Sequence, residues 1–140
     1  MAERTFIDSE GVERLLIDGD TTTDSQGNRQ RIMGYDALET DKLIRNDKGE
    51  LEFIRGDVGG EEQAELISKI INEGNFKTVN NTGQTDRSEG ARELITLSNP
   101  EGEDLANLLY STGVVPLDEN ASPEAVRMKR EADLIATVLG

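Results

Sequence analysis

The chain has 140 residues, a length typical of one domain, and it contains neither cysteine nor histidine. Disulfides, thiolate metal sites and cysteine nucleophiles are therefore excluded, and so is Ser-His-Asp catalysis. Because zinc sites usually need histidine or cysteine, a metal bound here has to take oxygen ligands, which favours Ca²⁺, Mg²⁺ or Mn²⁺.

The formal net charge of −14 argues against broad adhesion to nucleic acid through a basic face, but it leaves room for a local cationic site. The first ten residues contain no apolar run of the kind found in signal peptides. No apolar run approaches the length of a membrane span. We therefore expect a single domain over residues 1–140, cytoplasmic or associated with a particle, that does not enter a membrane.

The first part of the chain predicts β-strands joined by tight turns. Thr5–Ile7 and Arg14–Ile17 flank Ser9–Gly11, which indicates a hairpin. The polar stretch Thr21–Asn28 predicts a second turn, and Arg29–Tyr35 a further strand. Three short strands in succession are typical of a meander.

Residues 41–60 predict an excursion from the meander that ends in a small hairpin, with arms at Leu43-Ile44 and Leu51–Ile54. A helix is expected over Glu61–Glu73, because its apolar residues recur at helical spacing. Gly74 occupies the position expected of a C′ glycine.

The remaining elements alternate between strand and helix. Strands are predicted over Phe76–Asn80 and Glu93–Ser98, on either side of the polar loop Thr82–Gly90. A second helix is predicted over Glu103–Thr112, and Gly113 stops it.

The third helix has a clear start signal, with Ser122 as N-cap and Pro123 as the first helical residue. Its apolar residues predict one buried stripe, at Ala125, Met128, Ala132, Ile135 and Leu139. The whole order, βββ-α-ββ-α-α, indicates an α+β protein dominated by β-structure. A five-stranded barrel of the OB type with three helices packed outside fits that order.

Polar residues concentrate where two predicted strands meet. Asp18-Gly19-Asp20-Thr21 ends one strand, and Arg31, Asp36 and Glu39 lie on or just after the next strand of the meander. In an antiparallel meander such positions can converge at one end of the sheet. Carboxylates, an arginine and an oxygen-bound cation are the chemical minimum for a phosphodiester: a metal neutralises charge, a guanidinium clamps oxygens, and a carboxylate handles water.

With these residues the sequence resembles the staphylococcal-nuclease-like (thermonuclease) family. The hallmark of that family is Asp-Gly-Asp-Thr, followed by an arginine five residues before Asp-x-Pro-Glu. Residues 18–21 match the first motif fully, and Arg31, Asp36 and Glu39 keep the family spacing, with Leu38 in place of the proline. The later order of helices and strands also fits, and Gly90-Ala91-Arg92 stands where the family has Tyr-Gly-Arg.

The resemblance implies a role for each matching residue. Asp20 and Asp36 would supply oxygens to a metal, as would the backbone carbonyl of Ala37. Glu39 would position or deprotonate the attacking water, and Arg31 and Arg92 would contact the scissile phosphate. The family uses Ca²⁺, and Mg²⁺ or Mn²⁺ would also suit oxygen ligands.

Other readings of the same residues stay open. Taken alone, Asp-Gly-Asp-Thr is more often a solvated turn than a metal site. An EF-hand over Asp18–Arg29 fails, because Thr23 and Arg29 stand where that loop needs glycine and glutamate. Arg87 is the rival of Arg92 as second phosphate arginine, but it precedes the glycine and no strand follows it directly.

Two functions are therefore expected as alternatives. The first is a metal-dependent endonuclease that hydrolyses DNA or RNA by in-line attack of a carboxylate-activated water. The second is a noncatalytic module of the same fold that serves a larger assembly such as a virion. The acidic surface favours the second function, whereas the presence of all five polar positions, Asp20, Arg31, Asp36, Glu39 and Arg92, favours the first.

Overall fold

The computed structural model describes residues 4–86 and 91–139, and within them it is an α+β protein dominated by β-structure. A six-stranded sheet, a separate two-stranded sheet and three helices make up this part of the chain. The elements are β1 (Thr5–Ile7), β2 (Glu13–Asp18), β3 (Thr21–Thr23), β4 (Arg29–Ile32), β5 (Lys42–Arg45), β6 (Leu51–Ile54), α1 (Gly60–Gly74), β7 (Thr78–Thr85), β8 (Glu93–Ser98), α2 (Leu105–Ser111) and α3 (Pro123–Leu139).

The main sheet has the order β1-β2-β3-β4-β8-β7. Its neighbouring strands are antiparallel, except that β4 and β8 run parallel. The sheet therefore holds six strands instead of the predicted five, and it is not closed into a barrel. Near the two ends of this order, the Ser9 N–H donates to the Lys77 carbonyl at 2.8 Å, which is one hydrogen bond and no strand pairing.

The strand boundaries differ from the prediction at several places. The predicted turn Thr21–Asn28 begins with strand β3, because three consecutive β-branched threonines suit a pleated ladder. The predicted strand Arg29–Tyr35 ends early, at Ile32, because Gly34 adopts a φ of 105° that an extended strand does not allow. Strand β7 also begins and ends later than predicted and takes in part of the expected loop.

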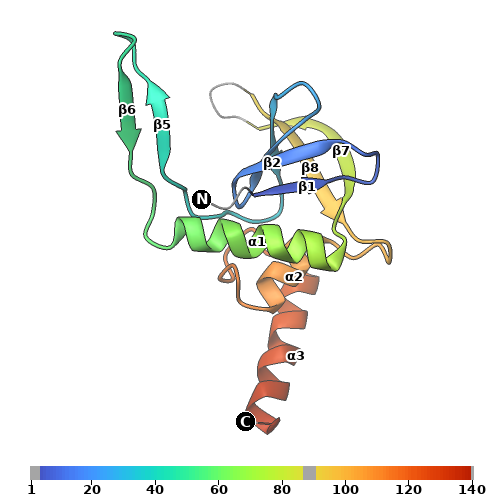
Figure 1. The fold of residues 1–140 in the computed structure, drawn as a ribbon. Coiled ribbons are helices and arrows are strands. Elements are labelled where there is room, and N and C mark those ends of the chain that lie inside the picture. The colour runs from blue at the N-terminus through green and yellow to red at the C-terminus, as the bar shows by residue number, and fades with distance from the viewer. Residues whose placement is uncertain (1–3, 87–90, 140) are drawn as a thin grey trace.

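Helix α1 lies against β1 and β2 (Figure 1), and its apolar face is in the core. Ala64, Ile67 and Ile71 are fully buried on that face. The prediction for Gly74 was wrong: Gly74 is the last helical residue, and Asn75 takes the left-handed conformation with a φ of 57°. A side chain at 74 would still be crowded, because a Cβ there would lie 2.7 Å from Cε2 of Phe76 and the ring would have to shift.

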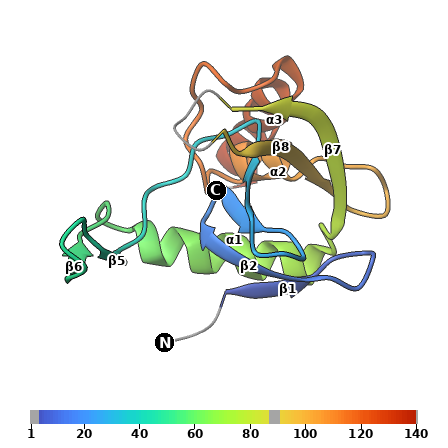
Figure 2. The same cartoon turned by 90° about the horizontal axis from the view of Figure 1, so that it is seen from above.

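Helices α2 and α3 pack on each other, with α2 against β8, and they lie on the β8 side of the sheet, away from β1 and β2 (Figure 2). The predicted helix stop and start are confirmed. Gly113 follows α2 with a φ of 77°, and the Ala125 N–H donates to Ser122 Oγ at 3.0 Å to cap α3.

The predicted buried stripe of α3 is wrong over most of its length. Ala125 is fully buried, but Ile135 is 57% exposed and Leu139 is 81% exposed. Figure 1 shows the reason, since α3 leaves the body of the protein after its first turns and ends at a free tip.

The predicted hairpin within residues 41–60 is confirmed as β5 and β6, with Leu43 paired to Phe53. It projects from the body in both views (Figures 1 and 2), and its apolar side chains are exposed. No helix in residues 4–86 or 91–139 is both long and apolar enough to cross a membrane.

The core lies between the main sheet and the helices. It is built from apolar side chains of both layers: Phe6, Leu16, Ile32, Tyr35, Ile67, Ile71, Phe76, Ile95, Leu97, Leu105, Leu109, Tyr110 and Val115. Beyond Leu16 and Ile32 the same inner face becomes polar. There Arg14 forms an ion pair with Asp8 at 2.7 Å and donates to Gln30, and all three residues are buried.

Candidate functional site

The Asp-Gly-Asp-Thr turn joins β2 to β3 and packs tightly against α1 and against the segment that follows β4. A Cβ on Gly19 would lie 2.6 Å from Cδ1 of Ile67 and 2.9 Å from the Cβ of Ala37, so the backbone approaches α1 as closely as a glycine permits. From the other direction, the hydroxyl of Tyr35 donates to the Gly19 carbonyl at 2.5 Å. Tyr35 is itself fully buried. The core therefore holds the turn in place through packing on one side and a hydrogen bond on the other.

Asp18 is an anchor for the segment that follows β4. Its Oδ1 accepts hydrogen bonds from the N–H and the hydroxyl of Thr40 and from Nζ of Lys42, each at 2.8 Å. Burial by itself raises the pKa of Asp18, but the bonds from Lys42 and Thr40 outweigh it and the pKa is lowered. Asp18 is therefore held as a carboxylate and ties residues 36–42 to the sheet.

Asp20 lies at the centre of the candidate site, with its side chain only 9% exposed. The Ala37 N–H donates to Oδ2 at 3.0 Å, and the Thr21 hydroxyl donates to Oδ1 at 3.2 Å. Burial raises the pKa of Asp20, and this effect exceeds the opposing ones of the Ala37 hydrogen bond and the Arg31 charge. Asp20 is thus a carboxylate whose negative charge is poorly compensated.

Arg31 joins the two predicted metal ligands. Its Nη2 lies 3.5 Å from Oδ2 of Asp20 and forms a salt bridge with Oδ1 of Asp36. Burial lowers the pKa of Arg31, but the hydrogen bond to Asp36 and the charges of both carboxylates outweigh burial and raise it. The two carboxylates therefore meet at one guanidinium nitrogen.

Asp36 is the more solvent-exposed of the two carboxylates. Its side chain is 57% exposed, and its second oxygen accepts a hydrogen bond from Nδ2 of Asn120 at 3.0 Å. Asn120 stands in the loop before α3, 84 residues further along the chain. This partner has no sequence motif, and sequence reasoning missed it.

Glu39 lies on the same loop as Asp36 but does not join the carboxylate pair. Its side chain is 65% exposed and contacts Nζ of Lys42 at 3.3 Å. Its backbone is fixed on both sides by Asp57, whose carboxylate accepts from the Glu39 N–H at 2.7 Å and whose N–H donates to the Glu39 carbonyl at 2.9 Å. Glu39 thus presents a solvated carboxylate from a well-anchored backbone.

Arg92 precedes β8 and approaches Asp20 from the other side. Its Nη1 donates to Thr21 Oγ1 at 3.1 Å, and Thr21 in turn donates to Asp20. Asp86 holds the guanidinium through an ion pair at 2.8 Å. Arg87 and Gly90 lie outside the described residues, so the choice between Arg87 and Arg92 stays a prediction.

The donors fit an oxygen-bound cation that arrives with a phosphate. Mg²⁺ and similar hard cations are often bound through one or two carboxylates, water and substrate phosphate. Asp20 and Asp36 supply two such carboxylates, and Ala37 lies directly beside Asp20. Within residues 4–86 and 91–139, no three acidic side chains group closely enough to hold an ion unaided. In this arrangement Arg31 and Asn120 engage the two oxygens of Asp36.

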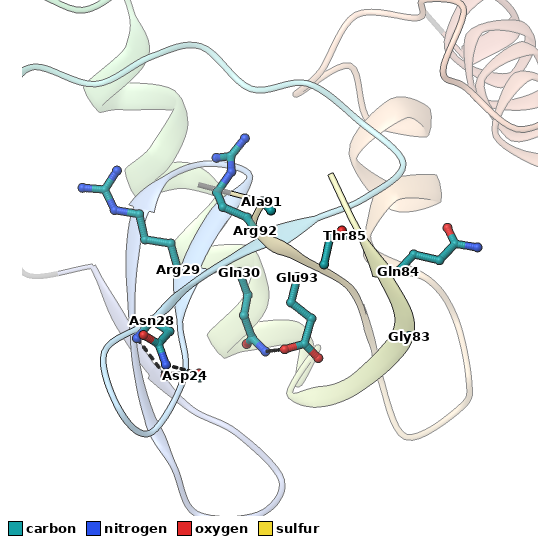
Figure 3. A pocket seen from close by; sticks show the side chains of 10 residues that line it. All are labelled: Asp24, Asn28, Arg29, Gln30, Gly83, Gln84, Thr85, Ala91, Arg92 and Glu93. Atoms are coloured by element: carbon teal, nitrogen blue, oxygen red, sulfur yellow. Dashed lines mark hydrogen bonds between the residues drawn. The ribbon is translucent and has the colours of Figure 1, made fainter. Parts of the chain in front are cut away.

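A polar cavity of about 880 Å³ adjoins the site at Arg92 (Figure 3). The turn between β3 and β4, the facing ends of β4 and β8, and the end of β7 form its walls. No protein-family model matches the sequence, and comparisons with curated proteins and with solved structures give no match either. Any inference of function therefore comes from the geometry of these residues.

Proposed function

We propose that the protein is a metal-dependent phosphodiesterase that hydrolyses nucleic acid, built on a staphylococcal-nuclease-like fold of the OB type. The sheet order supports the fold proposal. A meander of antiparallel strands is extended by a parallel β4–β8 pair and then by β7, and the Ser9–Lys77 hydrogen bond joins the two ends. The proposed OB-fold, a partly open five-stranded barrel, is a common support for oligonucleotide binding.

One observation carries the functional proposal. Asp20 and Asp36 meet at Nη2 of Arg31, while Arg92 reaches the second oxygen of Asp20 through Thr21. Two guanidinium groups and two carboxylates therefore form one connected set at the edge of the sheet. Such a set can bind the oxygens of a phosphodiester and, once Arg31 transfers from Asp36 to phosphate, offer both carboxylates to a cation.

The chemistry assigned to the chain is the addition of water across one P–O bond. The water oxygen bonds to phosphorus, the ester oxygen opposite leaves, and the products are a phosphate monoester and a hydroxyl. Glu39 accepts the proton of the attacking water, since its carboxylate is solvated and hydrogen-bonded to Lys42. Arg31 and Arg92 stabilise the charge that develops on the equatorial oxygens. A bound Ca²⁺, or Mg²⁺ or Mn²⁺, would neutralise phosphate charge and favour ionisation of that water.

The test is degradation of a DNA plasmid and of a single-stranded RNA by the purified protein with millimolar-scale Ca²⁺, Mg²⁺ or Mn²⁺, each compared with excess chelator. We expect hydrolysis that depends on one of these ions. A protein that cleaves neither substrate with any of the three ions would refute the proposal.

The noncatalytic alternative is favoured by a separate observation. Leu43, Leu51 and Phe53 on the hairpin are more than 60% exposed, and so is Val138 on α3. Two projecting elements with exposed apolar side chains are typical of surfaces covered by a partner. If the protein cleaves nucleic acid, substitution of these side chains should leave the cleavage rate unchanged. That result would separate partner binding from catalysis.

A further inference from the structure

The outer face of the β4–β8 pair carries a row of arginines that extends beyond the candidate site. Gln30 is paired with Glu93 in the parallel register, and their side chains are hydrogen-bonded at 3.3 Å. Because side chains alternate along a strand, Arg29 and Arg92 turn to the opposite side. Figure 3 shows both arginines extending to one side and Gln30 and Glu93 to the other. Arg31, two residues from Arg29, shares the arginine side.

The three arginines differ in how their charge is compensated. Arg31 is paired with Asp36 and Asp20, and Arg92 is paired with Asp86. Within residues 4–86 and 91–139, no ion pair or hydrogen bond engages the guanidinium of Arg29. In a chain with a net charge of −14, an arginine left uncompensated beside two phosphate-binding candidates provides a local cationic spot.

The polar cavity lies beside this row and suits a nucleotide. Its volume of about 880 Å³ is within the range of small-molecule sites. Arg29 and Arg92 line it together with the amides of Asn28 and Gln84 and the hydroxyl-bearing Thr85, which can donate to or accept from base edges and sugar hydroxyls.

Two acids also line the cavity, and both are already engaged. Asp24 accepts hydrogen bonds from the backbone of its own turn, at 2.9 Å from Gln26 and 2.8 Å from Asn28. Glu93 accepts from Gln30. Their hydrogen bonds hold them in the walls of the cavity, so the group that remains available to a ligand charge is Arg29.

Resting on the proposed function, we infer that this face binds a single-stranded segment of the nucleic-acid substrate, with Arg29 on a phosphate next to the scissile one and the adjoining nucleotide in the cavity. Arg29 and Arg31 are separated by about 6.6 Å along the strand, a spacing on which two successive phosphates of an extended chain can lie. A nucleotide can enter the cavity only when it is unstacked, which favours a single strand over a duplex. None of the described residues that line the cavity is aromatic, so affinity has to come from phosphate contacts and be sensitive to salt.

The test is fluorescence anisotropy with a labelled single-stranded oligothymidylate, in excess chelator so that no hydrolysis takes place. Arg29→Gln is compared with wild type and with Arg55→Gln, which removes the same charge from an exposed position before α1. We expect Arg29→Gln to weaken binding about tenfold and to lower the slope of log K against log salt by about 0.7. Arg55→Gln should change neither quantity, and both variants should keep the wild-type melting temperature.

Three results would overturn the inference: equal affinities of the two variants, duplex bound as tightly as the single strand, or wild type that binds no oligonucleotide. The outcome of the hydrolysis assay is independent of the outcome of this binding assay. Binding that depends on Arg29 without hydrolysis under any ion would keep the nucleotide site and refute the hydrolase. Hydrolysis with undiminished binding by Arg29→Gln would refute the nucleotide site alone.

Discussion

Asp18 and Asp20 stand two residues apart in one turn, and the structure treats them in opposite ways. Both are buried, and burial raises the pKa of each. At Asp18 the bonds from Lys42 and Thr40 reverse that effect, whereas at Asp20 the Ala37 N–H and Arg31 do not. Asp18 therefore stabilises the fold as a carboxylate. The ionised carboxylate of Asp20 destabilises the fold, and the candidate site keeps it nonetheless.

The two substitutions Asp18→Asn and Asp20→Asn should consequently change stability with opposite signs. The lowered pKa of Asp18 gives stability that is present above the unfolded-state value and lost as pH falls through the folded-state value. Asp18→Asn should cost about 1–3 kcal/mol at neutral pH, and the loss should shrink toward about pH 3. The raised pKa of Asp20 is a cost that is present above its folded value and absent below the unfolded one, so Asp20→Asn should be the more stable protein at neutral pH.

Urea denaturation of wild type and both variants, at neutral pH and near pH 3, measures these differences. Equal destabilisation by the two substitutions at neutral pH would show that the two carboxylates are not distinguished in the way the hydrogen bonds indicate.

At the residue scale, the sequence predicts which side chains gather but not what holds them. Arg31, Asp36 and Asp20 could be grouped from motif spacing, because one turn and one strand place them at the same sheet edge. Thr40 and Asn120 could not be found, because they reach Asp18 and Asp36 across 22 and 84 residues. Such contacts depend on how a loop folds back, and neither residue type nor periodicity encodes that.

Among the elements, the loop between β4 and β5 is the one that decides the site. It carries Asp36 and Glu39, and it packs against Gly56, which precedes α1, and Gly60, the first residue of α1. A Cβ on Gly60 would lie 2.0 Å from the Glu39 carbonyl oxygen, and one on Gly56 would lie 2.4 Å from it. The position of Glu39 therefore depends on the close approach of helix and loop.

Gly60→Ala should disturb this loop, because the contact it creates is with backbone that cannot rotate away. We expect a loss of about 1–3 kcal/mol in the free energy of unfolding, together with loss of phosphodiester cleavage. Gly74→Ala is the matched control, since its Cβ would meet the ring of Phe76 at the other end of α1. It should cost comparable stability and leave cleavage intact. Denaturation curves and cleavage rates of the two variants check this, and identical effects on cleavage would count against a site that depends on the loop.

Helix α3 shows where periodicity misleads. Its apolar spacing predicts a buried stripe, but spacing reports that a face is apolar and not that a partner covers it. Within the described chain the covered part ends after the first turns, and Ile135 and Leu139 point into solvent.

Ile135→Ala should therefore change the free energy of unfolding by less than about 0.5 kcal/mol. Ile95→Ala, which removes the same atoms from a fully buried position on β8, should cost about 2–5 kcal/mol. Thermal or chemical denaturation of both variants makes the comparison. A large loss from Ile135→Ala would mean that α3 is covered in solution.

For the whole molecule, the fold class follows from the sequence but the shape of the sheet does not. Short strands, turns and three helices with recognisable ends predict an α+β protein. Barrel closure depends on twist and on pairing between β1 and β7. In the part of the chain that the structure describes, the Ser9–Lys77 hydrogen bond links segments adjoining these two strands without ladder pairing. The sixth strand is β3, Thr21–Thr23, which the sequence pattern placed in a turn.

Charge is the second property of the whole molecule. The chain has 29 acidic and 15 basic side chains, so carboxylates outnumber cations. At the candidate site, Asp20 and Asp36 would repel each other if Arg31 did not lie between them. A divalent cation binding at that edge should stabilise the fold by linkage, by about 2.7 kcal/mol at about 100 times Kd. Calorimetry with and without millimolar-scale Ca²⁺ should show that Ca²⁺ raises the melting temperature of wild type and leaves that of Asp36→Asn unchanged. Asp47→Asn on the hairpin should behave as wild type. A wild-type melting temperature indifferent to Ca²⁺, Mg²⁺ and Mn²⁺ would contradict a metal at this site.

We propose that this acidic protein hydrolyses phosphodiesters with Glu39 as the base. The most direct test of this claim is the single-turnover cleavage rate of an oligonucleotide by Glu39→Gln, compared with wild type and with Glu52→Gln on the hairpin. Because the Glu39 side chain is solvated, the substitution should leave the fold unchanged and lower the rate by about 10²–10⁴-fold, whereas Glu52→Gln should cleave at the wild-type rate. Equal cleavage by Glu39→Gln and wild type would contradict the claim.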